Sequence, residues 1–360
     1  MHIAKPVIAL TAFALGTGLN AQDKPDAPVT AAQKSEVVRT LGTKLREFYV
    51  FPEKAETTAG ELQAKSDAGT YAGYTTSQAF ADALRTDLRT AGDDRHLQVR
   101  YDPSFREMQH EHGAPGPEDV RQMREEMAAN GYGVERTAHL PGNIGYIDLR
   151  FFGPTEFVAP AYEAAMHLLG GSRAIIVDLR SNGGGDPSSV AQFASHFFAA
   201  GDERHLNSIY SRIDGTTRDF WTVRSTGTRF TGPVYVLTSD YTFSGGEELA
   251  YDLKTQKRAT LVGETTGGGA NPGAPLSLGH GFYAFIPSGR AINPVTNTNW
   301  EHVGVTPEHA VEAESALGVA YTMALEEAAS SEADSNAKAE REALAKDLPE
   351  EMPRWKHPRE

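Results

Sequence analysis

Hydrophobic positions follow a helical spacing in the first part of the chain and an alternation of strands and helices in the second. Over 30–49 and 77–88 the apolar side chains recur every three or four residues, which predicts amphipathic helices. Gly60, Gly69 and Gly73 are expected to interrupt the helical pattern between them. In the second part, short β-branched apolar runs alternate with helical segments, which indicates an α/β layer. The predicted strands are 144–149, 174–179, 234–237 and 259–262, with a helix over 156–169 and a hairpin near 282–286.

Composition indicates how these elements are grouped. The predicted order is a signal peptide (1–21), an N-terminal helical subdomain (22–104), a connector or lid (105–142), an α/β core (143–310) and a helical, polar C-terminal tail (311–360). The connector carries glycines and prolines around a charged helical piece. The last residues of the tail, roughly 25 of them, are polar, and we expect them to be solvated and frayed.

The first 21 residues have the pattern of a secretory signal. Lys5 supplies a positive start, 7–15 is a brief apolar run, and Ala21 is a small residue after which we expect cleavage. The run is too short to cross a bilayer, and no other stretch approaches the roughly 18 apolar residues of a membrane helix. We therefore expect a periplasmic or secreted protein with no integral membrane segment after signal cleavage.

Charge and cysteine content limit the classes of partner and site. The formal net charge of −14 argues against nucleic acid or an anionic membrane surface as a partner. The chain has no cysteine, which excludes disulfides, a thiol nucleophile and a cysteine-rich metal site. With 360 residues, of which 39% are hydrophobic, the chain can bury the core of one large or two moderate domains.

Ser244 stands between a predicted strand, 234–237, and a helical pattern with acids in its first turn. A serine at such a turn can present its hydroxyl at the end of a sheet, beside the positive end of a helix. The alternative is structural, because Ser244 and Glu247 also form the Ser-x-x-Glu pattern of a capping box. The window alone leaves both interpretations open.

Three glycines, 183–185, follow the predicted strand 174–179. A phosphate cradle is one interpretation, but neither Gly-Lys-Ser/Thr nor G-x-G-x-x-G is present. A loop whose bare N–H groups face a developing negative oxygen is a second, and a purely structural turn is a third.

Histidines provide the other candidate chemistry. His96 follows two acids and opens a short apolar run, and a lone histidine of this kind is more often a packing residue than a catalyst. His110 and His112 suggest a metal, but a third ligand at a suitable spacing is missing, which favours a polar loop. The acid pairs 93–94 and 247–248 are most simply a turn and a match to a helix dipole.

Several blocks of the second part occur together in a recognisable order. They are GNIGYIDLRFF (142–152), AIIVDLRSNGGG (174–185), the stretch 233–269 and WEHVGVTPE (300–308). In this combination the chain resembles the tail-specific, or C-terminal-processing, serine peptidase family, and more closely its branch with the tricorn protease and the interphotoreceptor retinoid-binding protein modules. The resemblance implies a crotonase/Clp-protease-like layered βαβ core and neither a metal nor an organic cofactor.

The resemblance also implies a nucleophile and an oxyanion hole. Ser244 matches the family's nucleophile, and the N–H of Gly245 matches one oxyanion donor. Gly184 matches the other donor, with Gly183 and Gly185 as alternatives.

The implied base depends on the branch of the family. One branch places a lysine 25 residues after the nucleophile, and here that position is Gly269, which excludes a Ser–Lys dyad. The tricorn-like branch uses a histidine and a glutamate, which His96 and Glu301 match. That branch has a serine directly before the histidine, and here the residue is Arg95. Glu301 is expected to contact His96 directly or through Arg95, unless the relay is broken.

The predicted function is a serine endopeptidase that acts on peptides or unfolded proteins through an acyl-enzyme. In this scheme a base must take the proton of the serine hydroxyl, a carboxylate must orient that base, and two N–H groups must stabilise the oxyanion. Two alternatives remain at this point: a non-catalytic module that binds apolar ligands on the same fold, and a hydrolase of small esters or amides. The sequence leaves the oligomeric state open.

Overall fold

The central element of the protein is a six-stranded sheet with strand order β12–β8–β7–β4–β3–β2. The computed structural model describes residues 26–105, 116–224, 227–348 and 353–358. The strands are β2 (Val134–Leu140), β3 (Ile144–Leu149), β4 (Ala174–Asp178), β7 (Val234–Thr238), β8 (Thr260–Gly263) and β12 (His309–Ala310). All neighbours pair in parallel except β2, which lies antiparallel to β3 at one edge. The predicted α/β layer is confirmed.

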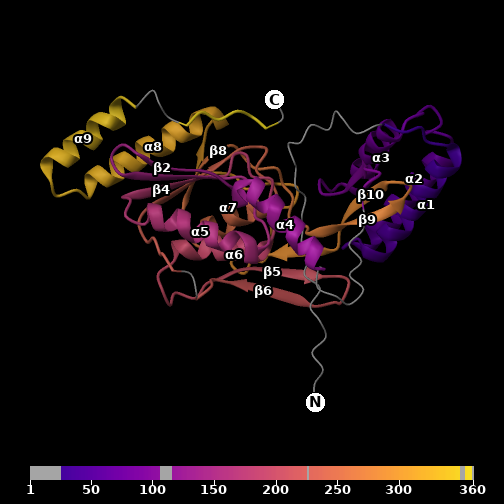
Figure 1. Cartoon of the computed structure of the whole chain (residues 1–360), viewed down its shortest axis with the longest axis horizontal. Helices are drawn as coiled ribbons and strands as arrows, with labels where there is room; N and C mark the ends of the chain where they lie inside the picture. Colours follow the sequence, from indigo (N-terminus) through magenta and orange to yellow (C-terminus); the bar gives the residue numbers. More distant parts are fainter. Residues whose placement is uncertain (1–25, 106–115, 225–226, 349–352, 359–360) are drawn as a thin grey trace, which may run out of the picture.

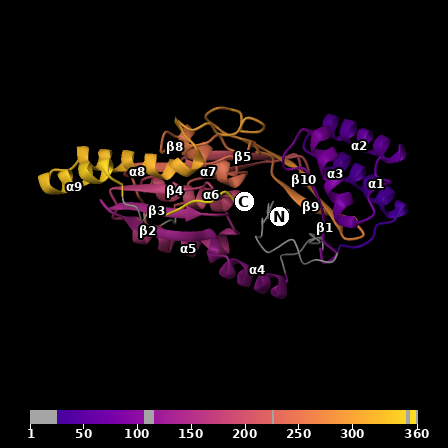
Figure 2. The ribbon, with the colours of Figure 1, turned by 90° about the horizontal axis from the view of Figure 1, so that it is seen from above.

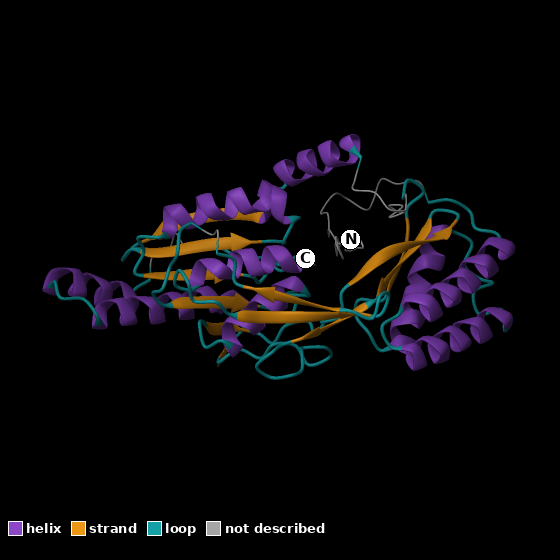
Figure 3. Ribbon diagram, turned by 90° about the horizontal axis from the view of Figure 1, so that it is seen from below, coloured by secondary structure: helices purple, strands orange, loops and turns teal. Residues whose placement is uncertain are grey.

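Helices cover both faces of this sheet (Figures 1 and 3). One face packs against α5 (Thr155–Leu169), α6 (Pro187–Ala194) and α7 (Gly245–Thr255), and the other packs against α8 (Ala313–Ser330). Successive side chains of a strand point to opposite faces, so Val236 lies in the first core and Leu237 in the second. Strands buried on both faces read as continuous apolar runs, which is why their positions were predicted closely.

The N-terminal part forms a separate lobe (Figures 1 and 2). Its helices are α1 (Ala31–Phe48), α2 (Pro52–Asp67) and α3 (Ser77–Gly92), and they pack on a sheet with the order β1–β10–β9. The strands of that sheet are β1 (Gln98–Tyr101), β9 (Gly273–Gly279) and β10 (Phe282–Pro287). Because β1 pairs with β10, the residues just before β1 lie beside the segment that leads into β9. This pairing joins parts of the chain that are far apart in sequence.

A third sheet and a further helix complete the middle of the molecule. The sheet has the order β11–β5–β6, with β5 (His205–Ser211), β6 (Thr217–Trp221) and β11 (Gly289–Ile292). The helix α4 (Pro117–Ala129) precedes β2, and short 3-10 turns occur at Gly131–Gly133 and Ser195–Phe197. Within the described ranges, no helix combines the length and the apolar character needed to cross a membrane.

Two predictions about the first half of the chain are wrong. Gly60 was expected to interrupt the helical pattern, but it lies inside α2, which begins at Pro52. A Cβ at Gly60 would meet no atom within 4 Å, so the helix tolerates this glycine at a cost of about 1 kcal/mol. The region predicted as a connector also contains β2, whose mixed polar pattern reflects its place at the edge of the sheet.

The C-terminal tail is more ordered than its polar composition predicted. α9 (Ser335–Lys346) packs along α8, and Leu344 and Leu348 join the core beneath it. Further on, the Trp355 indole N–H donates to Ser181 Oγ at 2.8 Å, and the Arg180 guanidinium lies over its ring at 5.3 Å. The end of the tail is solvated as expected, since most of its described residues are exposed, but the expectation that it is frayed is wrong because scattered apolar side chains anchor it.

Candidate active site

Ser244 lies in the tight connection between β7 and α7. Its backbone has φ 53° and ψ −119°, a conformation that residues other than glycine rarely adopt. The adjoining loops hold this turn: the Phe243 N–H donates to the Asn182 carbonyl at 3.0 Å, and the Gly246 N–H donates to the Phe243 carbonyl at 2.9 Å. A strained serine between a strand and a helix is the geometry that exposes a nucleophilic hydroxyl at the end of a sheet.

Glu247 connects this turn to a second loop. Its carboxylate accepts from the Ser244 N–H at 2.8 Å, as in a capping box. It also accepts from the N–H groups of Gly268 at 2.6 Å and Gly269 at 2.8 Å, and from the Thr266 hydroxyl at 2.5 Å. Burial raises the pKa of Glu247 to about 7. Sequence reasoning assigned Glu247 only to the helix end, whereas its carboxylate fixes the loop 266–269 next to the serine.

The glycine loop after β4 also lies against Ser244, since a Cβ built on Gly184 would be 2.7 Å from the Ser244 Cβ. The Gly184 N–H donates to the Asn182 side-chain oxygen at 2.8 Å, and the Gly183 N–H donates to the Arg150 carbonyl at 3.1 Å. Within the described residues, no hydrogen bond engages the N–H of Gly185 or that of Gly245. These two residues lie close together, because a Cβ on Gly245 would be 3.0 Å from the Gly185 nitrogen.

His96 lies beside Phe243, the residue that precedes the serine. Its ring is 4.5 Å from the Phe243 ring, and a Cβ built on Gly269 would be 2.6 Å from the His96 Cε1. The two rings therefore fill the space that any side chain at position 269 would need. Burial is the main cause that lowers the pKa of His96, to about 4, so the imidazole is neutral near pH 7.

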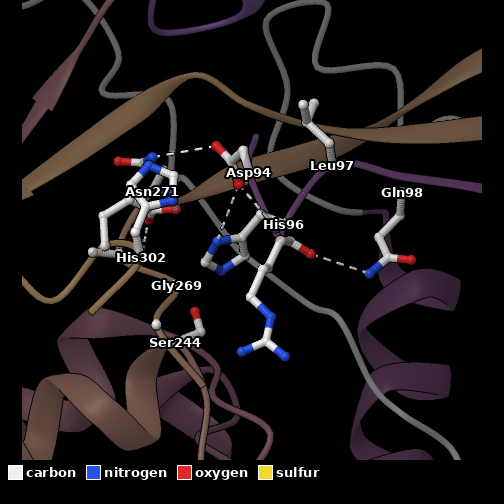
Figure 4. Close-up of polar contacts among 12 residues, drawn as sticks. Asp94, His96, Leu97, Gln98, Ser244, Gly269, Asn271 and His302 are labelled. Atoms are coloured by element: carbon white, nitrogen blue, oxygen red, sulfur yellow. Dashed lines mark hydrogen bonds and ion pairs between the residues drawn. The ribbon is translucent and has the colours of Figure 1, made fainter. Parts of the chain in front are cut away.

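Two carboxylates lie next to this imidazole, and Figure 4 shows one of them, Asp94. Asp94, His96 and Glu301 each offer an atom, and these atoms lie within 4.8 Å of one another. Asp94 Oδ1 accepts from the His96 backbone N–H at 2.8 Å and is 3.9 Å from Nδ1 of the ring. The Glu301 Oε2 accepts from the Ala270 N–H at 2.6 Å. Burial, followed by the charge of Asp94, raises the pKa of Glu301 to about 8.

Asp94 was interpreted from sequence as part of a turn, and the structure gives it more contacts. Its Oδ2 accepts from the Tyr49 hydroxyl at 3.1 Å and from the Asn271 side-chain amide at 3.2 Å. Tyr49 belongs to the N-terminal lobe, while Asn271 lies just before β9. The only signal in the sequence was the Asp-x-His spacing, and the partners become visible only once β1 pairs with β10.

Arg95 stands where the tricorn-like branch has a serine, and it points to another partner. Its guanidinium donates to the Gly267 carbonyl, while the Arg89 guanidinium donates to the Arg95 carbonyl at 2.9 Å. Glu301 lies near His96, but no hydrogen bond joins the two side chains among the described residues, so the alternatives that the sequence left open stay open.

Ser244 and His96 lie in the same region, next to Gly269 (Figure 4). No hydrogen bond joins them, and within the described part of the chain neither ring nitrogen of His96 has a hydrogen-bond partner. Catalytic hydrogen bonds are often long in unliganded enzymes and shorten when the substrate binds. His110 and His112 lie outside the described residues.

The serine also lines a small cavity. A cavity of about 10 Å³ is lined by Gly185, Ser244 and Gly269, together with Pro187 and Ile209. The last two residues also line a larger cavity of about 60 Å³, whose other walls come from Asp186, Ser188, Ser211, Ile213, Asp214, Thr216, Arg218 and Phe220. Short strands are predicted from the sequence around Ser208 and Trp221, where β5 and β6 lie, but their place in the wall of a cavity is not.

A strained serine, unengaged glycine N–H groups and a neutral imidazole beside carboxylates are the kinds of group that hydrolases use for acyl transfer. Comparison with known proteins also indicates a hydrolase. The chain belongs to peptidase family S41: residues 143–311 match the family itself, and residues 29–131 match the N-terminal domain of Peptidase_S41 in eukaryotic IRBP. The predicted family is confirmed.

Individual relatives are more distant. Carboxyl-terminal-processing peptidase 2, chloroplastic, of Arabidopsis thaliana is 31% identical over 188 residues, which are 48% of this chain and 34% of that protein. The chain thus spans only about a third of the length of this relative.

Solved structures agree in fold. A candidate peptidase from Parabacteroides merdae superposes with a TM-score of 0.54 at 17% identity, over 81% of this chain and 92% of the other. The tricorn protease gives 0.52 at 12% identity, over 91% of this chain and 38% of the tricorn chain. At these identities the likeness shows the fold alone.

Proposed function

We propose that the protein is a secreted or periplasmic serine endopeptidase that cleaves peptides or unfolded proteins through an acyl-enzyme. Membership of a peptidase family supports the reaction class, and the predicted signal at 1–21 supports the location. The observation that carries the proposal is the packing around Gly269, where the loop held by Glu247 lies against both Ser244 and His96.

In the proposed mechanism the Ser244 hydroxyl attacks the scissile carbonyl while the neutral His96 imidazole takes its proton. The same imidazole then gives the proton to the leaving amine. Asp94 and Glu301 stabilise the imidazolium that forms between these steps, and they hold the ring in position. A water molecule, activated by the same base, releases the acyl group.

We assign the oxyanion hole to the N–H groups of Gly245 and Gly185. Gly245 is the donor expected from sequence, whereas Gly185 replaces Gly184, whose N–H is already bound to Asn182. Each such donor contributes about 3–4 kcal/mol to transition-state stabilisation in known hydrolases. Glycine is required at position 185 because its φ is 141° and the Phe152 backbone leaves no room for a Cβ.

The test is cleavage of an internally quenched unfolded protein by the wild type, Ser244→Ala and His96→Ala. We expect turnover by the wild type alone, with unchanged folding by circular dichroism. Ser330→Ala, at the far end of α8, is the matched control and should retain full activity. An active Ser244→Ala would refute the nucleophile.

The alternatives are separated by the same series. Cleavage of short esters but not of the quenched protein would indicate a small-molecule hydrolase. A folded wild type that lacks turnover, as both variants do, would instead favour the non-catalytic binding module.

A further inference from the structure

The proposed base, His96, and the two carboxylates beside it also have the chemistry of metal ligands. Asp94 and Glu301 offer carboxylate oxygens and His96 an imidazole nitrogen, all within 4.8 Å of one another. Zinc bound by imidazole and carboxylate has bonds of about 2.0–2.2 Å, which places tetrahedral ligand atoms about 3.3 Å apart. Shifts of about 1 Å or less would therefore close the set around one ion.

Among the described residues, two of the three ligand residues offer atoms without a competing partner, whereas Asp94 Oδ1 also accepts from the His96 backbone N–H. Both ring nitrogens of His96 and the Glu301 Oε1 are buried without a hydrogen bond in the described part of the chain. His96 is only 6% exposed, and the Glu301 side chain only 8%. Buried polar atoms normally have partners, so three such atoms at one point call for an occupant.

The outer oxygens of both carboxylates are already held. Asp94 Oδ2 accepts from the Tyr49 hydroxyl and the Asn271 amide, and Glu301 Oε2 accepts from the Ala270 N–H. This leaves Oε1 of Glu301 and Oδ1 of Asp94 on the side of the imidazole. Second-sphere hydrogen bonds of this kind orient ligands in protein metal sites. Figure 4 shows the contacts of Asp94 with two of its partners, His96 and Asn271.

The cluster also has a neighbour that reaches solvent. His302 is partly exposed, with 43% of its side chain accessible, and its Nδ1 is 4.0 Å from the Glu301 Oε1. His302 therefore places a further imidazole, open to solvent, beside the buried Glu301 carboxylate.

We propose that Asp94, His96 and Glu301 form a binding site for a divalent transition-metal ion, zinc by its ligand chemistry, beside Ser244. A mixed imidazole and carboxylate set suits zinc better than magnesium or calcium, which prefer oxygen ligands alone. A nitrogen bound to zinc has no free lone pair for a proton. If His96 is the base, as the proposed function requires, zinc is a reversible inhibitor of this enzyme.

The test uses Ser244→Ala, produced without a histidine tag, so that binding is measured without turnover. Titration with zinc chloride in an isothermal calorimeter should give one ion per chain. His96→Gln and Glu301→Gln in this background should each weaken binding by about 100-fold, and Tyr49→Phe, which loses only a second-sphere bond, by about 10-fold. The matched control is His280→Gln, since His280 pairs with Glu36 far from the cluster and should leave the affinity unchanged.

Absence of saturable binding at one ion per chain would overturn the proposal, and so would wild-type affinity in folded His96→Gln and Glu301→Gln variants. The test is independent of the proposed function. Zinc bound by Ser244→Ala alongside a wild type that never cleaves would retain the metal site and reject the peptidase. An active wild type that zinc neither binds nor inhibits would retain the peptidase and reject the metal site.

Discussion

Replacing Gly269 with alanine tests the geometry of the site without touching a reacting group. The new Cβ would lie 2.6 Å from the His96 Cε1 and still closer to the Phe243 ring. That contact is about 0.9 Å shorter than the roughly 3.5 Å optimum between carbon atoms, so the imidazole must move by a similar amount. Misplacement of a catalytic group by about 1 Å costs roughly 100-fold in rate.

We therefore expect Gly269→Ala to lower kcat/KM on the quenched protein by about 100-fold, mainly through kcat. Overpacking should lower the free energy of unfolding by about 1–3 kcal/mol, measured by urea denaturation. Gly171→Ala is the matched control, because its Cβ would meet no atom within 4 Å. Wild-type kcat/KM in a folded Gly269→Ala protein would show that His96 does not act from this position.

Three further predictions concern charge and pH. Because the pKa of Glu301 is raised to about 8, its carboxylate form accumulates only as the pH rises through that value. We expect kcat/KM to rise over the same pH range, and Glu301→Gln to abolish this rise. A wild-type profile that is flat from about pH 7 to 9 would contradict this. The Arg180 guanidinium lies 2.6 Å from the Asp178 carboxylate, which is only 2% exposed. Arg180→Ala leaves this carboxylate buried without its cation and should lower the free energy of unfolding, measured by urea denaturation, by about 3–5 kcal/mol. A loss below about 1 kcal/mol would show that the ion pair does not stabilise the fold. Burial raises the pKa of Glu247 and Glu248 to about 7, so their contribution to stability is full below their ordinary 4.5 and declines as the pH rises through 7. The melting temperature should be higher near pH 5 than near pH 8, and Glu248→Gln should narrow this difference. An equal difference in the wild type and in Glu248→Gln would contradict the assignment of the pH dependence to Glu248.

The parts of the fold predicted closely were those in which local pattern and tertiary environment agree. β3 and β4 are buried on both faces, so their apolar runs marked them within a residue of their bounds. The tight turn at Ser244 was also visible, since a strand, a serine and a helix start follow one another.

Other features depend on partners that are distant in the chain. Asp94 looked like a turn residue because its contacts with Tyr49 and Asn271 arise only when the N-terminal lobe pairs with β10. The choice between Gly184 and Gly185 depends on which N–H the Asn182 side chain takes, and no sequence pattern specifies it. Gly60 was wrongly predicted to break a helix, because the sequence does not show that it lies on an open face of α2, where a glycine is tolerated.

Labelling with a fluorophosphonate, followed by peptide mapping, tests the central assignment of Ser244 and His96 most directly. We expect one adduct per chain, located on Ser244 and absent from Ser244→Ala. His96→Gln should slow the labelling by about 100-fold or more while the protein stays folded, because the hydroxyl then lacks its base. An adduct on another residue, or labelling of His96→Gln at the wild-type rate, would contradict this assignment.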